Sequence, residues 1–128
     1  MKMLRGIVIG ILLLASGGVF AAAPTCVTNS SGSGVCTYTG KVKNIYINSG
    51  GLILLYFDMK LAIADAEAVG LTISNDNAAA YLVSANPDFA KLFYSTALAA
   101  QASKRDVTIQ MRGTQSGYLK FDRIWLAE

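Results

Sequence analysis

Residues 79–125 read AAYLVSANPDFAKLFYSTALAAQASKRDVTIQMRGTQSGYLKFDRIW, and this stretch decides the fold. It begins with a short β-prone run, Ala80–Ser84, continues through a helix, and ends in two segments that read as strands. The order strand, helix, strand, turn, strand in so short a segment indicates a small, mainly β domain with one helix.

The helix has a well-marked beginning. Asn86 is a good N-cap, Pro87 suits the first helical position, and Asp88 lies at the positive end of the helix dipole. Lys104 and Arg105 suit the negative end, so the helix is predicted to span residues 87–103. One apolar stripe at helical spacing is predicted to face the core: Phe89, Leu92, Phe93, Thr96, Ala97 and Ala100.

The segment after the helix predicts a hairpin. Apolar and polar residues alternate over Val107–Arg112, which is the pattern of a half-buried strand. Gly113–Gly117 is a loop of turn formers, and Tyr118–Leu126 resumes an extended pattern.

A second hairpin is predicted nearer the N-terminus, with arms Tyr38–Ile47 and Leu52–Met59. In the first arm the apolar residues are at even positions, Tyr38 and Val42, and then at odd positions, Ile45 and Ile47. This change near Lys43 or Asn44 predicts a bulge. Such a bulge would let one long strand bend and serve both edges of a small closed barrel. The second arm is apolar on both faces, so its outer face needs cover from the helix, from residues 60–73, or from another subunit.

The segment between the second hairpin and residue 79 is less regular. Leu61–Val69 is rich in alanine and predicts a short helix, Leu71–Ile73 is predicted to pair with a sheet edge, and Ser74–Asn77 is a loop. The assembled order is strand, strand, strand, helix, strand, strand. This order predicts the five-stranded Greek-key barrel called the OB-fold, in one α+β domain covering residues 22–128.

The N-terminus predicts export. Lys2 and Arg5 precede an apolar run that begins at Ile7, and small residues follow it, so residues 1–21 are expected to be a cleaved signal peptide. The alternative, a retained anchor, is disfavoured because the run is shorter than the roughly 20 residues of a spanning helix. We therefore expect a periplasmic or secreted protein whose mature chain has no membrane span.

The charge of the mature chain argues against a nucleic-acid partner. The sequence has eleven Lys and Arg and eight Asp and Glu, and removal of Lys2 and Arg5 leaves a net charge of +1. The longest basic run in the remainder is Lys104-Arg105.

The two cysteines, Cys26 and Cys36, are predicted to form one disulfide that closes an N-terminal hairpin. The alternative of a redox or metal pair lacks the Cys-x-x-Cys spacing, and the sequence has no histidine. We expect no metal, no cofactor and, with carboxylates scattered along the chain, no enzymatic activity.

The chain resembles the secreted OB-fold B subunits of pentameric bacterial toxins, of the cholera, heat-labile enterotoxin, subtilase and pertussis kinds. The resemblance covers most of the mature chain. It rests on the signal peptide, the N-terminal disulfide, the run Tyr81–Tyr94 with its Ala-rich helix, Val107–Met111, and the terminal strand Ile124–Leu126. The chain is also similar to a broader group of small secreted bacterial proteins of the same shape, whose roles are largely unassigned.

The toxin resemblance implies a homopentamer that recognises cell-surface glycans and, in toxins, carries a separate catalytic A chain. Three helix residues outside the core stripe are candidates for subunit contact: Tyr94, Leu98 and Ala102. The alternative function is an exported OB-fold module that binds a protein partner or a small ligand.

Candidate binding residues follow from the fold, since OB-fold ligands usually meet the second and third strands and the loops joining strands one to two and four to five. Those loops are Asn48–Gly51 and Gly113–Gly117. Polar and aromatic side chains in and beside them suit sugar hydroxyls and rings: Tyr46, Asn48, Ser49, Thr114, Gln115, Ser116 and Tyr118. The alternative is that these residues serve only as turn formers.

Overall fold

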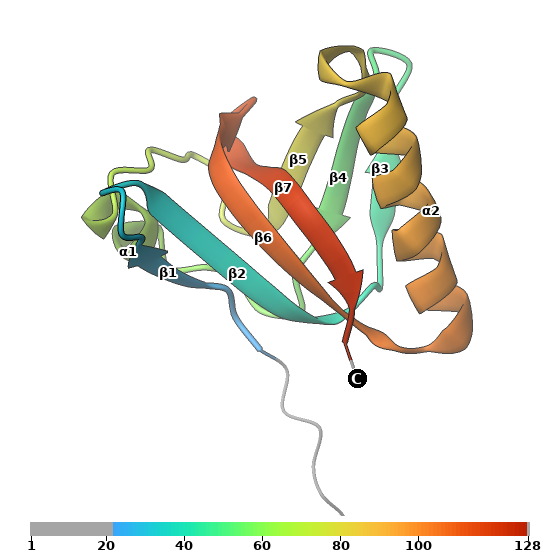
Figure 1. The fold of residues 1–128 in the computed structure, drawn as a ribbon, viewed down its shortest axis with the longest axis horizontal. Coiled ribbons are helices and arrows are strands. Elements are labelled where there is room, and N and C mark those ends of the chain that lie inside the picture. Colours follow the sequence, from blue (N-terminus) through green and yellow to red (C-terminus); the bar gives the residue numbers. More distant parts are fainter. Residues whose placement is uncertain (1–21, 128) are drawn as a thin grey trace, which may run out of the picture.

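The structure, a computed structural model, describes residues 22–127, so the predicted signal peptide lies outside the described residues. The strands form one twisted sheet in the order β1-β2-β6-β7-β5-β4-β3, and the long helix α2 lies along one side of it (Figure 1). In chain order the elements are β1 (Thr25–Thr28), β2 (Gly34–Lys41), β3 (Ile45–Ile47), β4 (Leu52–Tyr56), α1 (Ile63–Ala68), β5 (Ala78–Leu82), a 3₁₀ turn (Val83–Ala85), α2 (Pro87–Ser103), β6 (Asp106–Gln115) and β7 (Tyr118–Leu126).

The fold is mainly β with one main helix, as expected, but the predicted closed five-stranded barrel is wrong. Residues 22–127 form seven strands in an open sheet, with β1 and β3 as its edges. The two additional strands have separate origins. The N-terminal disulfide hairpin contributes β1, and the predicted long strand Tyr38–Ile47 is divided into β2 and β3.

The division falls at residues 42–44, where the change of parity predicted a bulge. The chain leaves the ladder there, and the two strands on either side find different partners. β2 pairs with β6, where Tyr38 is opposite Ile109, whereas β3 pairs with β4, where Tyr46 is opposite Leu54. Two consecutive strands therefore lie near opposite ends of the sheet.

A buried tyrosine holds this division. The Tyr38 hydroxyl donates to the Lys41 carbonyl and accepts from the Asp58 backbone N–H, both at 3.1 Å. The Asp58 side chain is only 7% exposed, and its Oδ1 lies 2.9 Å from Lys43 Nζ. Gly40 is required here because a Cβ atom would lie against the Tyr38 hydroxyl and 2.8 Å from Asp58 Oδ2.

Helix α2 has the predicted bounds. Asn86 Oδ1 accepts from the Phe89 backbone N–H at 3.0 Å, which caps the first turn. Phe93 stacks on Phe121 of β7, with ring centroids 3.8 Å apart. Leu92 is 69% exposed, so the predicted core stripe is wrong at this position. It lies about 100° around the helix from Phe93, outside the buried side, and the small Ala90 packs into the core instead.

The predicted short helix is confirmed as α1, but the predicted pairing of Leu71–Ile73 with a sheet edge is wrong. The disulfide hairpin already supplies the strand that pairs beside β2, and the side chains of Leu71 and Ile73 are buried in the core. The predicted loop Ser74–Asn77 is confirmed.

The predicted five-residue loop Gly113–Gly117 is wrong. β6 continues to Gln115, which pairs with Tyr118, so only Ser116 and Gly117 turn the chain. Both of these residues have positive φ angles, 53° and 81°. Turns of this kind match the twist of the flanking strands, which allows the hairpin to close over two residues.

The Cys26–Cys36 disulfide is confirmed, and the two cysteines are directly opposite each other in the β1–β2 ladder. Asn29 closes the turn, since its Oδ1 accepts the backbone N–H groups of Ser31 and Ser33 at 3.0 and 2.9 Å. Between residues 22 and 127, no helix is long and apolar enough to cross a membrane.

Removing the Tyr38 hydroxyl tests its role at the strand break. Tyr38→Phe leaves the Lys41 carbonyl and the Asp58 N–H without their partner, so we expect a loss of about 1–3 kcal/mol in the free energy of unfolding. Chemical denaturation measures this loss. The matched control is Tyr46→Phe on exposed β3, which we expect to change stability by less than about 0.5 kcal/mol. Equal losses of unfolding free energy in the two variants would contradict a stabilising role of the Tyr38 hydroxyl at the strand break.

A pH series provides a second test at the same residue. Burial raises the pKa of the Tyr38 phenol well above its ordinary value of 10.0, and the nearby Asp58 carboxylate adds to the shift. Because the folded chain holds this proton after the unfolded chain has lost it, Tyr38 contributes less stability above about pH 10. The stability difference between the native chain and Tyr38→Phe should narrow there, by at most about 1.4 kcal/mol per pH unit. A difference that stays constant to about pH 11 would contradict this.

Candidate functional site

An apolar surface lies on the outer side of the sheet, and we call it the tyrosine face. Ladder register places its residues side by side on β3, β4 and β5, and Tyr118 of β7 packs against the same cluster. Alternate residues of β4 point to the other side and join the main core. The tyrosine face consists of Tyr46, Leu52, Leu54, Tyr56, Ala78, Ala80 and Tyr118.

Small and large side chains divide this face into a floor and a rim. Leu54, Ala78 and Ala80 are at most 4% exposed and form the floor. Tyr46 is 46% exposed, and Tyr56 and Tyr118 are half-buried at the margins of the floor. Neighbouring side chains therefore cover the floor, and the accessible part of this face is largely that of the three rings, each with a hydroxyl that can both donate and accept hydrogen bonds.

The covers expected from within the chain for this outer face pack elsewhere. Helix α2 packs on the inner side of the sheet through Phe93 and Ala97. Leu61, Leu71 and Ile73, from the segment after β4, also belong to that inner core. Within residues 22–127, both helices pack on the inner side of the sheet, so the tyrosines of the rim form the outermost layer of the tyrosine face.

One end of the tyrosine face is polar. The β6–β7 turn lies there beside Tyr118, and the Gly117 carbonyl accepts the backbone N–H groups of Ser74 and Asn75 at 2.9 and 3.0 Å. Gln115 Nε2 donates to Ser116 Oγ at 3.0 Å. Gln115 and Ser116, two of the predicted binding residues, thus lie at this end, next to a loop that was not predicted to take part. Thr114 is opposite Leu119, whose side chain belongs to the inner core, so the structure does not place it on this face.

The other predicted loop lies at the opposite end of β4. Leu52 follows it directly, while Tyr56, next to Tyr118, ends the strand. Asn48 Oδ1 accepts the Leu52 N–H at 3.1 Å, so this oxygen already serves the turn, whereas Ser49 is exposed. The predicted binding residues in the two loops therefore lie at different ends of the tyrosine face, while the predicted Tyr46 and Tyr118 belong to the face itself.

Tyr56 is the residue of this surface that the sequence prediction of binding residues missed. The signal was present in the second arm, where Leu52, Leu54 and Tyr56 alternate with Ile53 and Leu55 so that both faces are apolar. In the part of the chain that the structure describes, no three His, Cys, Asp or Glu side chains lie close enough together to hold a metal ion.

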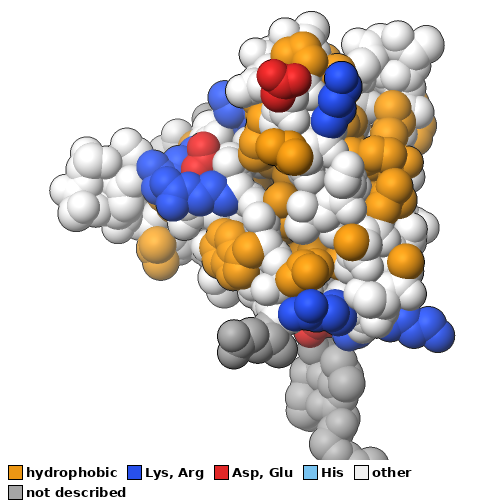
Figure 2. Space-filling model, turned by 45° about the vertical axis from the view of Figure 1, so that its right-hand side comes forward, with side chains coloured by type: hydrophobic (Ala, Val, Ile, Leu, Met, Phe, Trp, Pro, Cys, Tyr) orange, Lys and Arg blue, Asp and Glu red, His pale blue; other side chains and the backbone are white. Residues whose placement is uncertain are grey.

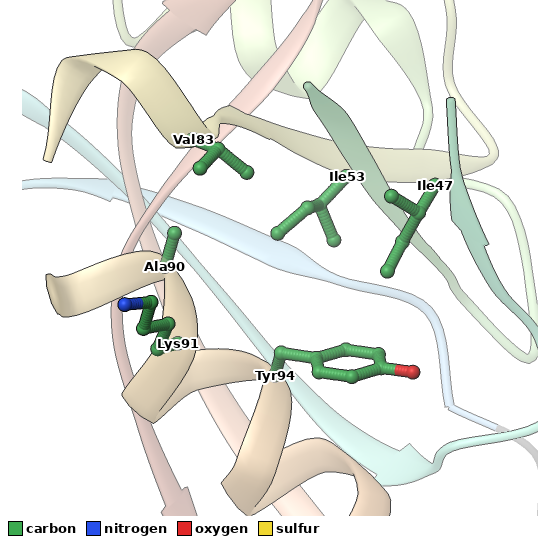
Figure 3. Close-up of a pocket in the computed structure, with 6 residues that line it drawn as sticks. All are labelled: Ile47, Ile53, Val83, Ala90, Lys91 and Tyr94. Atoms are coloured by element: carbon green, nitrogen blue, oxygen red, sulfur yellow. The ribbon is translucent and has the colours of Figure 1, made fainter. Parts of the chain in front are cut away.

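A hollow separate from the tyrosine face lies between α2 and the β3–β4 hairpin (Figure 3). Its volume is ≈ 130 Å³, and the ring of Tyr94 extends into it from α2 toward Ile47. Of the predicted subunit contacts, Tyr94 is therefore a half-buried part of this wall, while Leu98 is 38% exposed and Ala102 is exposed. The structure separates Tyr94 from the other two.

Comparison of the chain with protein-family models, with curated proteins and with solved structures finds no match in any of the three. The resemblance to toxin B subunits therefore stays a prediction. The function has to be argued from the geometry of the chain itself.

Proposed function

We propose that the mature chain is an exported, non-catalytic binding protein that recognises carbohydrate through the tyrosine face. The observation that carries the proposal is the set of three tyrosines, Tyr46, Tyr56 and Tyr118, which lie over an apolar floor on the outer side of the sheet and are only partly buried themselves. The Cys26–Cys36 disulfide is compatible with export, since such bonds persist in oxidising compartments.

The chemistry of the face suits a sugar better than a purely apolar ligand. A pyranose ring has an apolar face of C–H groups and a rim of hydroxyls. Tyrosine rings offer an apolar surface to the first, and their hydroxyls offer hydrogen bonds to the second. The turn at Ser116 and the loop at Asn75, which adjoin Tyr118, add further donors and acceptors at the polar end.

Strand order supports the same location. If β2 and β3 are counted as one divided strand, the order β3-β4-β5-β7-β6-β2 is that of the OB-fold. We propose that the chain is an open relative of that fold, extended by β1. In OB-folds, ligands meet the outer side of strands two and three, which correspond here to β4 and β5.

We further propose that the protein acts as a homo-oligomer of the toxin B-subunit type, with a cell-surface glycan as its ligand. A catalytic A chain would be its partner if it is a toxin component. Light scattering of the mature protein tests this part alone. A ring of five would support it, whereas a monomer at all concentrations would contradict the oligomer and leave the tyrosine face to be tested separately.

A glycan array tests the tyrosine face. We expect the native protein to bind a subset of glycans, and Tyr46→Ser combined with Tyr118→Ser to weaken binding roughly tenfold or more, since each stacked ring contributes about 0.5–1.5 kcal/mol. Val27→Ser, at an exposed apolar position on β1 away from the tyrosine face, is the control that should bind normally.

Two outcomes would contradict the carbohydrate site. One is the absence of binding to any glycan on the array. The other is binding that the tyrosine variants leave unchanged. Gln115→Ala with Ser116→Ala separates the two parts of the surface: a loss of binding assigns the turn to the site, and normal binding restricts the site to the tyrosines.

A further inference from the structure

Strand β7 has an edge that is only partly paired. It forms nine residues, Tyr118–Leu126, and pairs with β6 along its length, but it pairs with β5 only at Leu119 and Lys120. From residue 121 onward, no strand within residues 22–127 pairs with the edge that faces away from β6.

The backbone groups on this edge can be assigned. The Ala127 N–H donates to the Asp106 carbonyl at 2.9 Å, so the residue at 127 forms a hydrogen-bonded pair with β6. Hydrogen-bonded and non-hydrogen-bonded pairs alternate in antiparallel ladders. Ile124 and Leu126 therefore direct their N–H and C=O groups away from β6, where an additional strand would find them.

A groove runs along this edge beside the N-terminal half of α2. It consists of two adjoining hollows, of ≈ 420 and ≈ 240 Å³, both of which include Phe89 and Asp122 among their walls. Leu92 on the helix side is 69% exposed, and Trp125 on the strand side is 46% exposed. Hydrophobic side chains are visible in several patches on the face that carries α2 (Figure 2).

The margin of the groove is positively charged. Arg112 Nε and Arg123 Nε lie 3.4 and 3.3 Å from the same oxygen of Asp122, so two guanidinium groups share one carboxylate. Lys120 lines the second hollow and adds another cation. The margin therefore has an excess of positive charge, which favours a ligand that carries carboxylates.

We propose that this groove binds an extended segment of another protein, which adds to β7 as a strand. An apolar side chain of the segment packs between Leu92 and Trp125, and a carboxylate lies near Arg123. The groove is separate from the tyrosine face, so this activity goes beyond the carbohydrate binding proposed above.

A second copy of the chain fits the groove less well. It could offer its edge strands β1 and β3, with the sequences TCVT and IYI, neither of which contains an acidic residue. It could also offer the free part of its own β7, but the carboxylate there, that of Asp122, already contacts two arginines. The edge strands of a second copy would therefore leave the cations of the groove without a partner. A segment of a different chain, with alternating acidic and apolar residues, satisfies both the backbone edge and the charge.

Selection from displayed random peptides of about ten residues, the length of a long strand, tests the proposal. We expect the mature protein to enrich peptides that alternate acidic and apolar residues. Binding should shift the fluorescence of Trp125, which is the single tryptophan of the chain. Leu92→Asp changes a largely exposed position and should weaken binding roughly tenfold or more, as loss of an apolar anchor does. Ala99→Asp, at an exposed apolar position elsewhere on α2, is the matched control and should bind normally.

Methylated peptides test whether the bound segment pairs with β7 through backbone hydrogen bonds. Methylation of alternate peptide nitrogens in the register that faces β7 should abolish binding, whereas methylation in the other register should not. The proposal is overturned if no peptide binds, if Leu92→Asp binds as well as the control variant, or if both methylated peptides bind. Self-association that depends on Leu92 would overturn it in favour of a contact between copies. Tyr46→Ser with Tyr118→Ser should leave peptide binding intact, which separates this test from that of the carbohydrate site.

Discussion

The hydrogen bonds of the buried Tyr38 hydroxyl are the constraint on which the arrangement of the sheet depends. They join the end of β2 to the segment that follows β4, and so fix where the chain leaves one ladder and enters the next. Lys41 is opposite Asp106, the first residue of β6, so a strand that continued straight would run past the start of β6. The break instead brings Tyr46 opposite Leu54, which adds the third tyrosine to the tyrosine face.

Packing of α2 has a second consequence for the sheet. Phe93 stacks on Phe121, and Phe89 packs edge-on against Tyr81 at 4.9 Å, so the helix places aromatic rings between β5 and β7. These two strands pair only at Leu119 and Lys120 of β7 before they separate. The same contacts that bury the apolar side of the helix therefore keep the rest of β7 from pairing with β5.

Local signals in the sequence predicted local structure well. Asn86 and the residues after it gave the bounds of α2, and the two cysteines gave the disulfide, because each depends on neighbours close in the chain. The strand break was predicted only as a bulge, since Tyr38 and Asp58 are twenty residues apart and no periodicity reports their hydrogen bond. The exposure of Leu92 was missed for a similar reason: the stripe defines a side of the helix, but tertiary packing decides which part of it is buried.

The sequence prediction of the candidate site emphasised loop residues and gave too little weight to the strands. Polar turn residues were predicted to bind sugar hydroxyls, but the side-chain oxygen of Asn48 accepts a hydrogen bond within its own turn. The apolar outer side of β4 is the more informative feature. Leucine or phenylalanine at the rim would leave an apolar patch that favours aggregation in water. Tyrosine at positions 46, 56 and 118 keeps a polar end on each ring, which allows the face to remain hydrated until a ligand of mixed polarity covers it.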